Sequence, residues 1–198
     1  VKCQGGVPLA RVFDKSMQSI RRILDAGAQG VIVPMIRTAD DAREVVAAAK
    51  YPPLGKRGVG AGPYCCYGID LASDMSERND DILVIVMVET KEAVENIDEI
   101  MSVEGVDGMF LGPVDLSYSF GYRGQTSHPV IYEAMDKAKE ACLKYGKAPG
   151  MHLVTDRAGI KAAFDRGFTF VALSTATNFI YNGSRMAIED ARAVERGE

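Results

Sequence analysis

Two acidic residues, Glu89 and Asp115, lie at positions where parallel β/α folds carry their catalytic residues. Glu89 directly follows a strand predicted over residues 82–88, and Asp115 follows a strand predicted over residues 108–111 after a Gly-Pro-Val segment. Catalytic groups of such folds gather at the carboxyl ends of the strands, and neighbouring strands are about 4.8 Å apart. The two carboxylates can therefore approach one cation. Oxygen ligands favour a hard ion such as Mg²⁺ or Mn²⁺, completed by water and substrate oxygens.

Each acid also has an ordinary structural interpretation. Glu89 can cap a helix that begins near Lys91, and Asp115 can begin a turn. Arg11 favours the chemical interpretation, because it lies inside an apolar strand where an unpaired guanidinium is unfavourable. It needs an anion, which is either a ligand at the end of the strands or an acid such as Asp25 in a structural ion pair.

The rest of the chain predicts the elements that would carry these residues to one edge. Apolar runs alternate with amphipathic segments throughout, which predicts strands and helices in turn. The strands are expected at residues 8–13, 30–35, 82–88, 108–111, 148–153 and 168–173. The helices are expected at residues 17–26, 40–50, 91–101, 129–145, 156–166 and 178–198. Strands this apolar are typical of a parallel sheet with helices on both faces.

Six β/α units in a row predict either an open, doubly wound sheet or part of a (β/α)8 barrel. A complete barrel usually takes about 250 residues, which exceeds the 198 residues of this chain by about two units. Residues 12–16, between the first strand and the first helix, contain no glycine, which argues against a dinucleotide-binding sheet. We expect one α/β domain over residues 1–198, a TIM-barrel-type fold lacking its first two β/α units.

The composition argues against several partners. Acidic residues are in excess, with a net charge of −4 and a pI near 5.3, so nucleic acid is not expected as a partner. The longest apolar runs are far shorter than the roughly 20 residues of a membrane span. The 4 cysteines include no C-x-x-C pair, which indicates reduced thiols in a cytoplasmic protein. The long Pro- and Gly-rich connection over residues 51–81 is interpreted equally well as a lid or as an oligomer contact.

Five segments, taken in order, carry a resemblance to a known family. They are residues 9–12 (LARV), 24–35 (LDAGAQGVIVPM), 51–60 (YPPLGKRGVG), 88–90 (VET) and 105–117 (GVDGMFLGPVDLS). Together they make nearly the whole chain resemble the HpcH/HpaI family of class II pyruvate aldolases. The resemblance implies a (β/α)8 barrel that reversibly cleaves a 4-hydroxy-2-oxo acid into pyruvate and an aldehyde.

The resemblance also implies a role for each site residue. Glu89 and Asp115 hold the divalent ion, and Arg11 contacts the keto oxygen of pyruvate and stabilises the enolate. The backbone from Gly112 through Val114 to Asp115 binds the pyruvate carboxylate. In the same way, the resemblance makes Asp25 the aspartate that supports the basicity of a catalytic histidine.

The sequence departs from the family at two places. The catalytic histidine of the family follows the second strand, in a portion that this sequence lacks, and neither His128 nor His152 matches it. Both are expected to be ordinary, one in a surface loop and one in a strand. Met87 stands where the family often has a glutamine that contacts the substrate, so that hydrogen bond is expected to be absent or to come from another residue. A polypeptide this short is expected to bind metal and pyruvate weakly and to turn over poorly.

Two other functions remain as alternatives. One is a related metal-dependent lyase or decarboxylase that acts on an oxaloacetate-like or acyl-CoA substrate. The other is a non-catalytic oligomeric barrel that binds a keto acid. The family resemblance implies a homo-oligomer, a trimer or hexamer, with the helix over residues 178–198 as a contact. The loop over residues 56–81, which holds Tyr64, Cys65 and Cys66, is expected to shape the choice of aldehyde.

Overall fold

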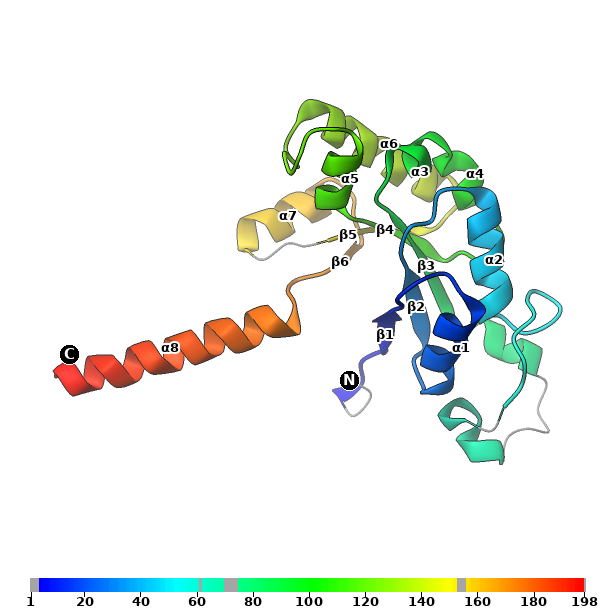
Figure 1. The fold of residues 1–198 in the computed structure, drawn as a ribbon, viewed down its shortest axis with the longest axis horizontal. Coiled ribbons are helices and arrows are strands. Elements are labelled where there is room, and N and C mark those ends of the chain that lie inside the picture. The colour runs from blue at the N-terminus through cyan, green and yellow to red at the C-terminus, as the bar shows by residue number, and fades with distance from the viewer. Residues whose placement is uncertain (1–3, 61, 70–74, 153–155, 198) are drawn as a thin grey trace.

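The fold is a wall of parallel strands backed by helices (Figure 1). The computed structural model describes residues 4–60, 62–69, 75–152 and 156–197. Its strands are β1 (Leu9–Arg11), β2 (Gly30–Val33), β3 (Leu83–Val88), β4 (Gly108–Leu111), β5 (Ala148–Met151) and β6 (Phe170–Val171). They form one 6-stranded sheet whose spatial order is the order of the chain. A doubly wound sheet reverses its strand order, whereas a barrel wall does not. The α/β prediction is confirmed as far as a six-stranded half-barrel.

The helices lie close to their predicted places. They are α1 (Met17–Asp25), α2 (Ala39–Ala49), α3 (Lys91–Glu95), α4 (Ile97–Ser102), α5 (Pro113–Ser119), α6 (Pro129–Lys144), α7 (Arg157–Asp165) and α8 (Ala176–Arg196), with 3-10 turns η2 (Pro63–Gly68) and η3 (Met75–Asn79). One predicted helix is broken at Asn96 into α3 and α4. The short α5 was not predicted; it begins with Pro113, whose missing N–H suits the first turn of a helix.

The helices α1, α2, α4 and α6 pack against one face of the sheet only. Side chains that alternate outward from the strands, such as Val31 and Val86, join the helices in the main core. The opposite face carries a second cluster built on Ile85, Met87 and Phe110, and its members come from the strands and the residue after β6. The prediction that helices cover both faces is therefore wrong. The strands are apolar on both sides because the inner face of a curved wall packs on itself.

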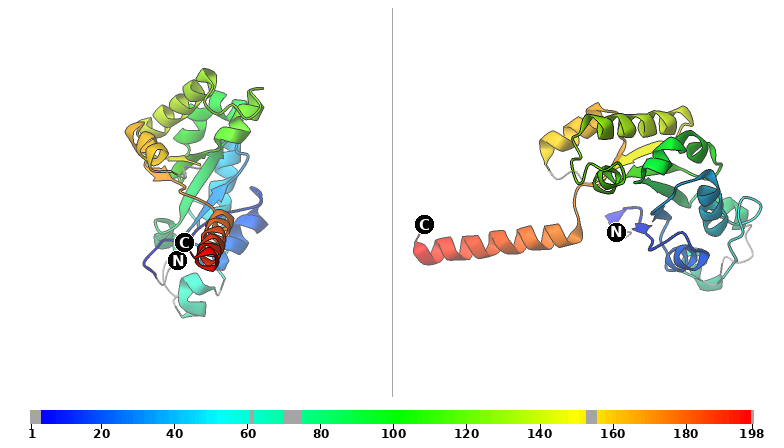
Figure 2. Two further views of the ribbon diagram at one scale, coloured as in Figure 1. Left: turned by 90° about the vertical axis from the view of Figure 1, so that its left-hand side faces the viewer. Right: turned by 45° about the horizontal axis from the view of Figure 1, so that its top comes forward.

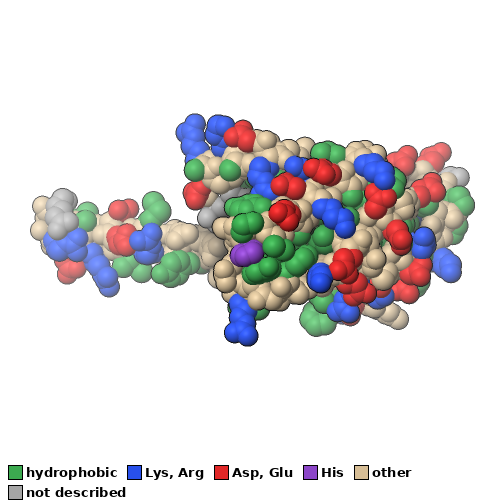
Figure 3. All heavy atoms as spheres, turned by 90° about the horizontal axis from the view of Figure 1, so that it is seen from above, with side chains coloured by type: hydrophobic (Ala, Val, Ile, Leu, Met, Phe, Trp, Pro, Cys, Tyr) green, Lys and Arg blue, Asp and Glu red, His purple; other side chains and the backbone are tan. Residues whose placement is uncertain are grey.

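Helix α8 differs from the other helices in its surroundings. It projects away from the half-barrel (Figures 1 and 2), and none of its residues is buried. Large hydrophobic side chains are exposed along it, and Figure 3 shows them gathered on the projecting arm. They are Phe179, Ile180, Tyr181, Met186, Ile188 and Val194. Among the described helices, none combines the length and the apolar character that crossing a membrane requires.

The long connection between α2 and β3 is anchored at the amino end of the strands. The Lys50 Nζ donates to the carbonyl of Asn79 at 2.7 Å and to that of Ile82. The Asn79 side chain in turn binds the backbone N–H and C=O of Tyr51, at 2.7 and 3.0 Å. The connection leads from the end of α2 into the amino end of β3. It therefore lies at the amino end of the sheet, opposite the carboxyl end where Glu89 follows β3.

The position of this connection tests the predictions that it acts as a lid or shapes the choice of aldehyde. Its described part lies at the opposite end of β3 from Glu89, so the expectation that it acts as a lid or selects an aldehyde is wrong for that part. The side chains of Tyr64, Cys65 and Cys66 are outside the described residues.

Candidate active site

Glu89 is held at the carboxyl end of β3 by a residue from a neighbouring strand. It is 4% exposed, and its Oε1 accepts a hydrogen bond from the N–H of Met35 at 2.8 Å. Met35 follows β2 with a φ of 58°, a left-handed conformation that is strained for a residue other than glycine. Thr90, rather than Glu89, caps α3, because its hydroxyl accepts from the N–H of Ala93. The capping interpretation of Glu89 is therefore wrong.

Gly112 brings the second carboxylate beside the first. A Cβ atom at position 112 would lie 3.3 Å from the Glu89 Oε2 and 3.7 Å from the Asp115 Oδ2. Both oxygens therefore face the same point, and their separation cannot exceed the sum of these two distances. That Cβ would also lie 3.2 Å from the Cβ of Glu89, so glycine keeps the space between the carboxylates open. Asp115 is exposed in the first turn of α5 rather than in an isolated turn.

This pair of carboxylates fits a hard divalent ion. Such ions bind proteins through one or two carboxylates and keep water and substrate oxygens for the remaining positions. Within the described part of the chain, no group of three or more His, Cys, Asp or Glu residues is close enough to hold a metal. Glu89 and Asp115 thus supply a partial ligand set, which suits an ion that also takes oxygens from a substrate.

Arg11 faces the inner side of the wall. Its Nε donates to the Sδ of Met87 at 3.3 Å, and Met87 belongs to the inner cluster. Among the residues that the structure describes, no carboxylate forms an ion pair with Arg11. Asp25 instead binds the Nη2 of Arg57 at 2.7 Å. The alternative interpretation of Arg11, an ion pair with Asp25, is therefore wrong, and the Arg11 guanidinium is exposed toward the inner face.

The structure places Asp25 apart from the other predicted site residues. It is the last residue of α1, next to the amino end of β2, whereas Glu89 and Asp115 lie past the carboxyl ends of β3 and β4. Its partner Arg57 is 3% exposed and stacks over the Tyr51 ring at 4.8 Å. The catalytic role of Asp25 stays a prediction.

The two histidines differ more than the sequence suggested. His128 caps α6, with its Nδ1 accepting from the Val130 N–H at 3.3 Å, and stacks on Tyr122 at 3.7 Å. His152 directly follows β5 and lies edge-on to Phe110, with ring centroids 5.7 Å apart. It lines a cavity of about 430 Å³ together with Asp115. Glu89 was identified by a strand-end rule, namely that catalytic groups lie directly after the carboxyl ends of parallel strands. The same rule applies to His152 and would have identified it.

The comparison with protein families decides the kinship of the chain. Residues 7–182 match the family model described as HpcH/HpaI aldolase/citrate lyase. The chain belongs to this family. The resemblance inferred from its five segments is confirmed.

Members of the HpcH/HpaI family resemble this chain in sequence and in fold. It is 38% identical over 178 residues to 4-hydroxy-2-oxo-heptane-1,7-dioate aldolase of Salmonella arizonae, covering 89% of this chain and 67% of the relative. It is 39% identical over 171 residues to 2-keto-3-deoxy-L-rhamnonate aldolase of Klebsiella pneumoniae, and the match covers 86% of this chain and 64% of the relative. The chain thus spans about two thirds of the length of these enzymes.

Solved structures extend the likeness to three dimensions. The crystal structure of an HpcH/HpaI aldolase from Desulfitobacterium hafniense matches with a TM-score of 0.85 at 33% identity, over 96% of this chain and 74% of that one. The structure of citrate synthase SbnG matches with a TM-score of 0.83 at 26% identity, over 98% and 76%.

Proposed function

We propose that this chain carries the metal- and pyruvate-binding part of a class II aldolase. The reaction is the reversible cleavage of a 4-hydroxy-2-oxo acid into pyruvate and an aldehyde. The observation that supports it most directly is the pair of oxygens from Glu89 and Asp115 that face one point beside Gly112. The names of the relatives, both aldolases of oxo acids, agree with this activity. Residues 1–198 are proposed to form a single, partial domain of the (β/α)8 type.

Glu89 and Asp115 would hold Mg²⁺ or Mn²⁺ through carboxylate oxygens. When bound, the ion supplies a Lewis acid next to the 2-oxo group of the substrate. The buried position of Glu89 and its bond to the Met35 amide fix one carboxylate oxygen and leave Oε2 toward the ligand side. Asp115 remains open to solvent, so substrate and water can reach it.

Arg11 and the start of α5 would bind the two ends of pyruvate. The N–H groups of Val114 and Asp115 lie in the first turn of α5, where a helix leaves its amides without partners inside the helix. They would donate to the substrate carboxylate. The Arg11 guanidinium, on the inner face, would donate to the keto oxygen. A fixed donor at such an oxygen typically contributes on the order of 100-fold in rate.

The bond changes in the cleavage define what each of these residues must do. The bond between C3 and C4 of the substrate breaks, and its electron pair passes to C3 and onto the keto oxygen. The hydroxyl proton of C4 moves to a base, the aldehyde leaves, and a proton then adds to C3 to give pyruvate. Arg11 stabilises the charge that arrives at the keto oxygen. Support of the base is the role proposed for Asp25. The protein is further proposed to be a cytoplasmic homo-oligomer, with the apolar side chains of α8 at a contact.

Manganese binding tests the site directly, through the electron paramagnetic resonance signal of free Mn²⁺. The wild-type chain is expected to bind Mn²⁺ more tightly when pyruvate is present. Glu89→Gln is expected to weaken binding at least about tenfold, because a neutral amide replaces a charged ligand. Glu92→Gln, an exposed acid in the first turn of α3, is the matched control and should bind as the wild type does. Unchanged binding in both Glu89→Gln and Asp115→Asn would overturn the proposal.

A second candidate is a lyase or decarboxylase that acts on an oxaloacetate-like substrate. The likeness to the citrate synthase structure favours it, and the same carboxylate pair would serve. Oxaloacetate decarboxylation, assayed beside aldehyde-dependent consumption of pyruvate, separates the two. Loss of oxaloacetate without any consumption of pyruvate would favour the second candidate.

A further inference from the structure

A cavity of about 430 Å³ adjoins the carboxylate pair. Its size falls within the roughly 300–1,000 Å³ of small-molecule sites. Gly112 and Asp115 form one side of it, so it opens beside the point that both carboxylate oxygens face. Met151 and His152, at the end of β5, line it too. The cavity therefore extends the candidate metal site toward the neighbouring strand.

The walls of this cavity are largely apolar. Val114, Met135 and Met151 contribute aliphatic side chains, and Tyr132 contributes an aromatic ring. Thr126 and His152 add hydrogen-bonding groups. The walls thus combine carbon surface with a few groups that can bind a hydroxyl or a carbonyl.

The described lining of the cavity carries negative charge and no positive charge from lysine or arginine. None of the described residues that line it is lysine or arginine, and Asp115 contributes a carboxylate. A bound anion would leave water for largely apolar walls, on which no described lysine or arginine could pair with it. Burial of an unpaired charge is strongly unfavourable. A neutral molecule avoids this penalty and can bury carbon against the two methionines.

We propose that this cavity is the subsite for the aldehyde half of the substrate, and that it accepts neutral aldehydes and rejects aldehydes that carry a carboxylate. The inference rests on the proposed aldolase function, in which the aldehyde leaves from the carbon next to the pyruvate unit. The substrate class is then a 4-hydroxy-2-oxo acid with a single carboxylate. Thr126 and His152 bind the oxygen atoms of the neutral tail, and Met135 and Met151 contact its carbon atoms.

Methionine methyl groups report directly on binding to the cavity. The full chain, labelled with ¹³C at its methionine methyls, is titrated in the presence of Mg²⁺ and pyruvate. Propane-1,2-diol serves as an unreactive neutral probe, and 4-hydroxybutyrate serves as an unreactive anionic probe. The diol is expected to shift the Met135 and Met151 signals at concentrations about tenfold lower than the anion needs. Met101, fully buried in the main core, should not move with either probe.

A charge variant sharpens the experiment. Thr126→Lys places a cation at the wall of the cavity and is expected to improve binding of 4-hydroxybutyrate at least about tenfold. Ser127→Lys, the neighbouring exposed residue that does not line the cavity, is the matched control and should change binding little. His152→Leu removes a hydrogen-bonding group and should lower the affinity for propane-1,2-diol a few-fold. This variant tests the subsite independently of Thr126→Lys.

The outcomes separate this inference from the proposed function. Equal shifts with both probes, or no shift with either, would overturn the neutral subsite. An unchanged affinity for 4-hydroxybutyrate in folded Thr126→Lys would do the same. If Glu89→Gln and Asp115→Asn both bind Mn²⁺ normally while the diol still shifts the two methionines selectively, the cavity stands as a neutral site and the metal-dependent aldolase fails. If Mn²⁺ binding is lost in Glu89→Gln but the probes do not discriminate, only the subsite fails.

Discussion

The two ends of the half-barrel sheet place their charged side chains in opposite ways. At the amino end, Lys50 is 4% exposed, donates to two backbone carbonyls and lies 3.7 Å from Asp107. At the carboxyl end, Glu89 binds one backbone amide, and Asp115 has no ion pair among the residues that the structure describes. Lys50 and Asp107 at the amino end hold the chain together, whereas Glu89 and Asp115 at the carboxyl end are left for a ligand. This division agrees with the separation of stability and chemistry seen in β/α barrels.

The largest effect is expected from Lys50→Met, at the amino end. The carbonyls of Asn79 and Ile82 lose their donor and Asp107 loses its cation, so the free energy of unfolding should fall by about 3 kcal/mol. Urea denaturation measures the change. The control is Lys161→Met, which removes an exposed i,i+4 pair with Asp165 and should change stability by less than about 0.5 kcal/mol. Equal effects in both variants would contradict the assignment of a structural role to this end.

The next effect is expected at the carboxyl end and concerns binding. Gly112→Ala puts a methyl group into the space between the two carboxylates, so the affinity for Mn²⁺ should fall about tenfold, or about 1.4 kcal/mol. The free energy of unfolding should change less than it does in Lys50→Met. Gly183→Ala, in α8, is the control because its Cβ would meet nothing within 4 Å. If both alanine variants bind the ion as the wild type does, the space beside Gly112 is not a ligand site.

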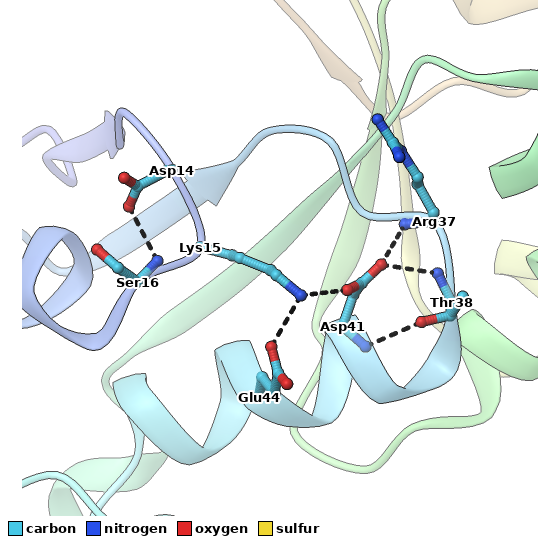
Figure 4. Close-up of polar contacts among 7 residues, drawn as sticks. All are labelled: Asp14, Lys15, Ser16, Arg37, Thr38, Asp41 and Glu44. Atoms are coloured by element: carbon cyan, nitrogen blue, oxygen red, sulfur yellow. Dashed lines mark hydrogen bonds and ion pairs between the residues drawn. The ribbon is translucent and has the colours of Figure 1, made fainter.

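The smallest effect is expected at the rim of the carboxyl end, where Asp41 joins two β/α units (Figure 4). Asp41 pairs with Lys15 and accepts the N–H groups of Arg37 and Thr38, at 2.9 and 3.1 Å. Burial alone would raise the pKa of Asp41, but these hydrogen bonds lower it below its ordinary 3.8. The stabilisation is therefore complete above pH 3.8 and is lost as the pH falls through the lowered pKa.

Asp41→Asn should lower the free energy of unfolding by about 1 kcal/mol at neutral pH. The difference from the wild type should shrink as the pH falls from 3.8 to below the lowered pKa of Asp41, where the folded wild-type carboxylate is protonated too. Urea denaturation at several pH values measures this. Asp40→Asn, in the same turn but in an exposed pair with Arg43, is the matched control and should show almost no difference. A difference that persists unchanged at acidic pH would rule out the ion pair as its source.

Local periodicity was enough to predict the strands and most helices of this fold. Each strand is a short apolar run, and the residue after β3 is an acid, so the strand-end rule identified Glu89 from the sequence alone. The same rule, together with the Gly-Pro-Val segment, identified Asp115. The helix break at Asn96 and the short α5 were missed, because periodicity is weak over segments of 5 to 7 residues.

Contacts between distant residues could not be predicted in the same way. The Met35 amide that holds Glu89 lies 54 positions away along the chain, and its left-handed backbone leaves no sequence signal in a methionine. The partner of Asp25 is Arg57, which belongs to the long connection rather than to a strand. Which acid pairs with which arginine depends on the packed structure, so sequence reasoning could only leave Arg11 open between a ligand and an acid such as Asp25.

The strictly sequential order of the strands has a consequence for biosynthesis. Each strand pairs in parallel with the strand made just before it, from β1 with β2 to β5 with β6. Domains fold as translation delivers them, at about 5–20 residues per second. The strands that carry Glu89 and Asp115 therefore leave the ribosome next to each other in time and ahead of α8, so their pairing does not have to wait for that helix.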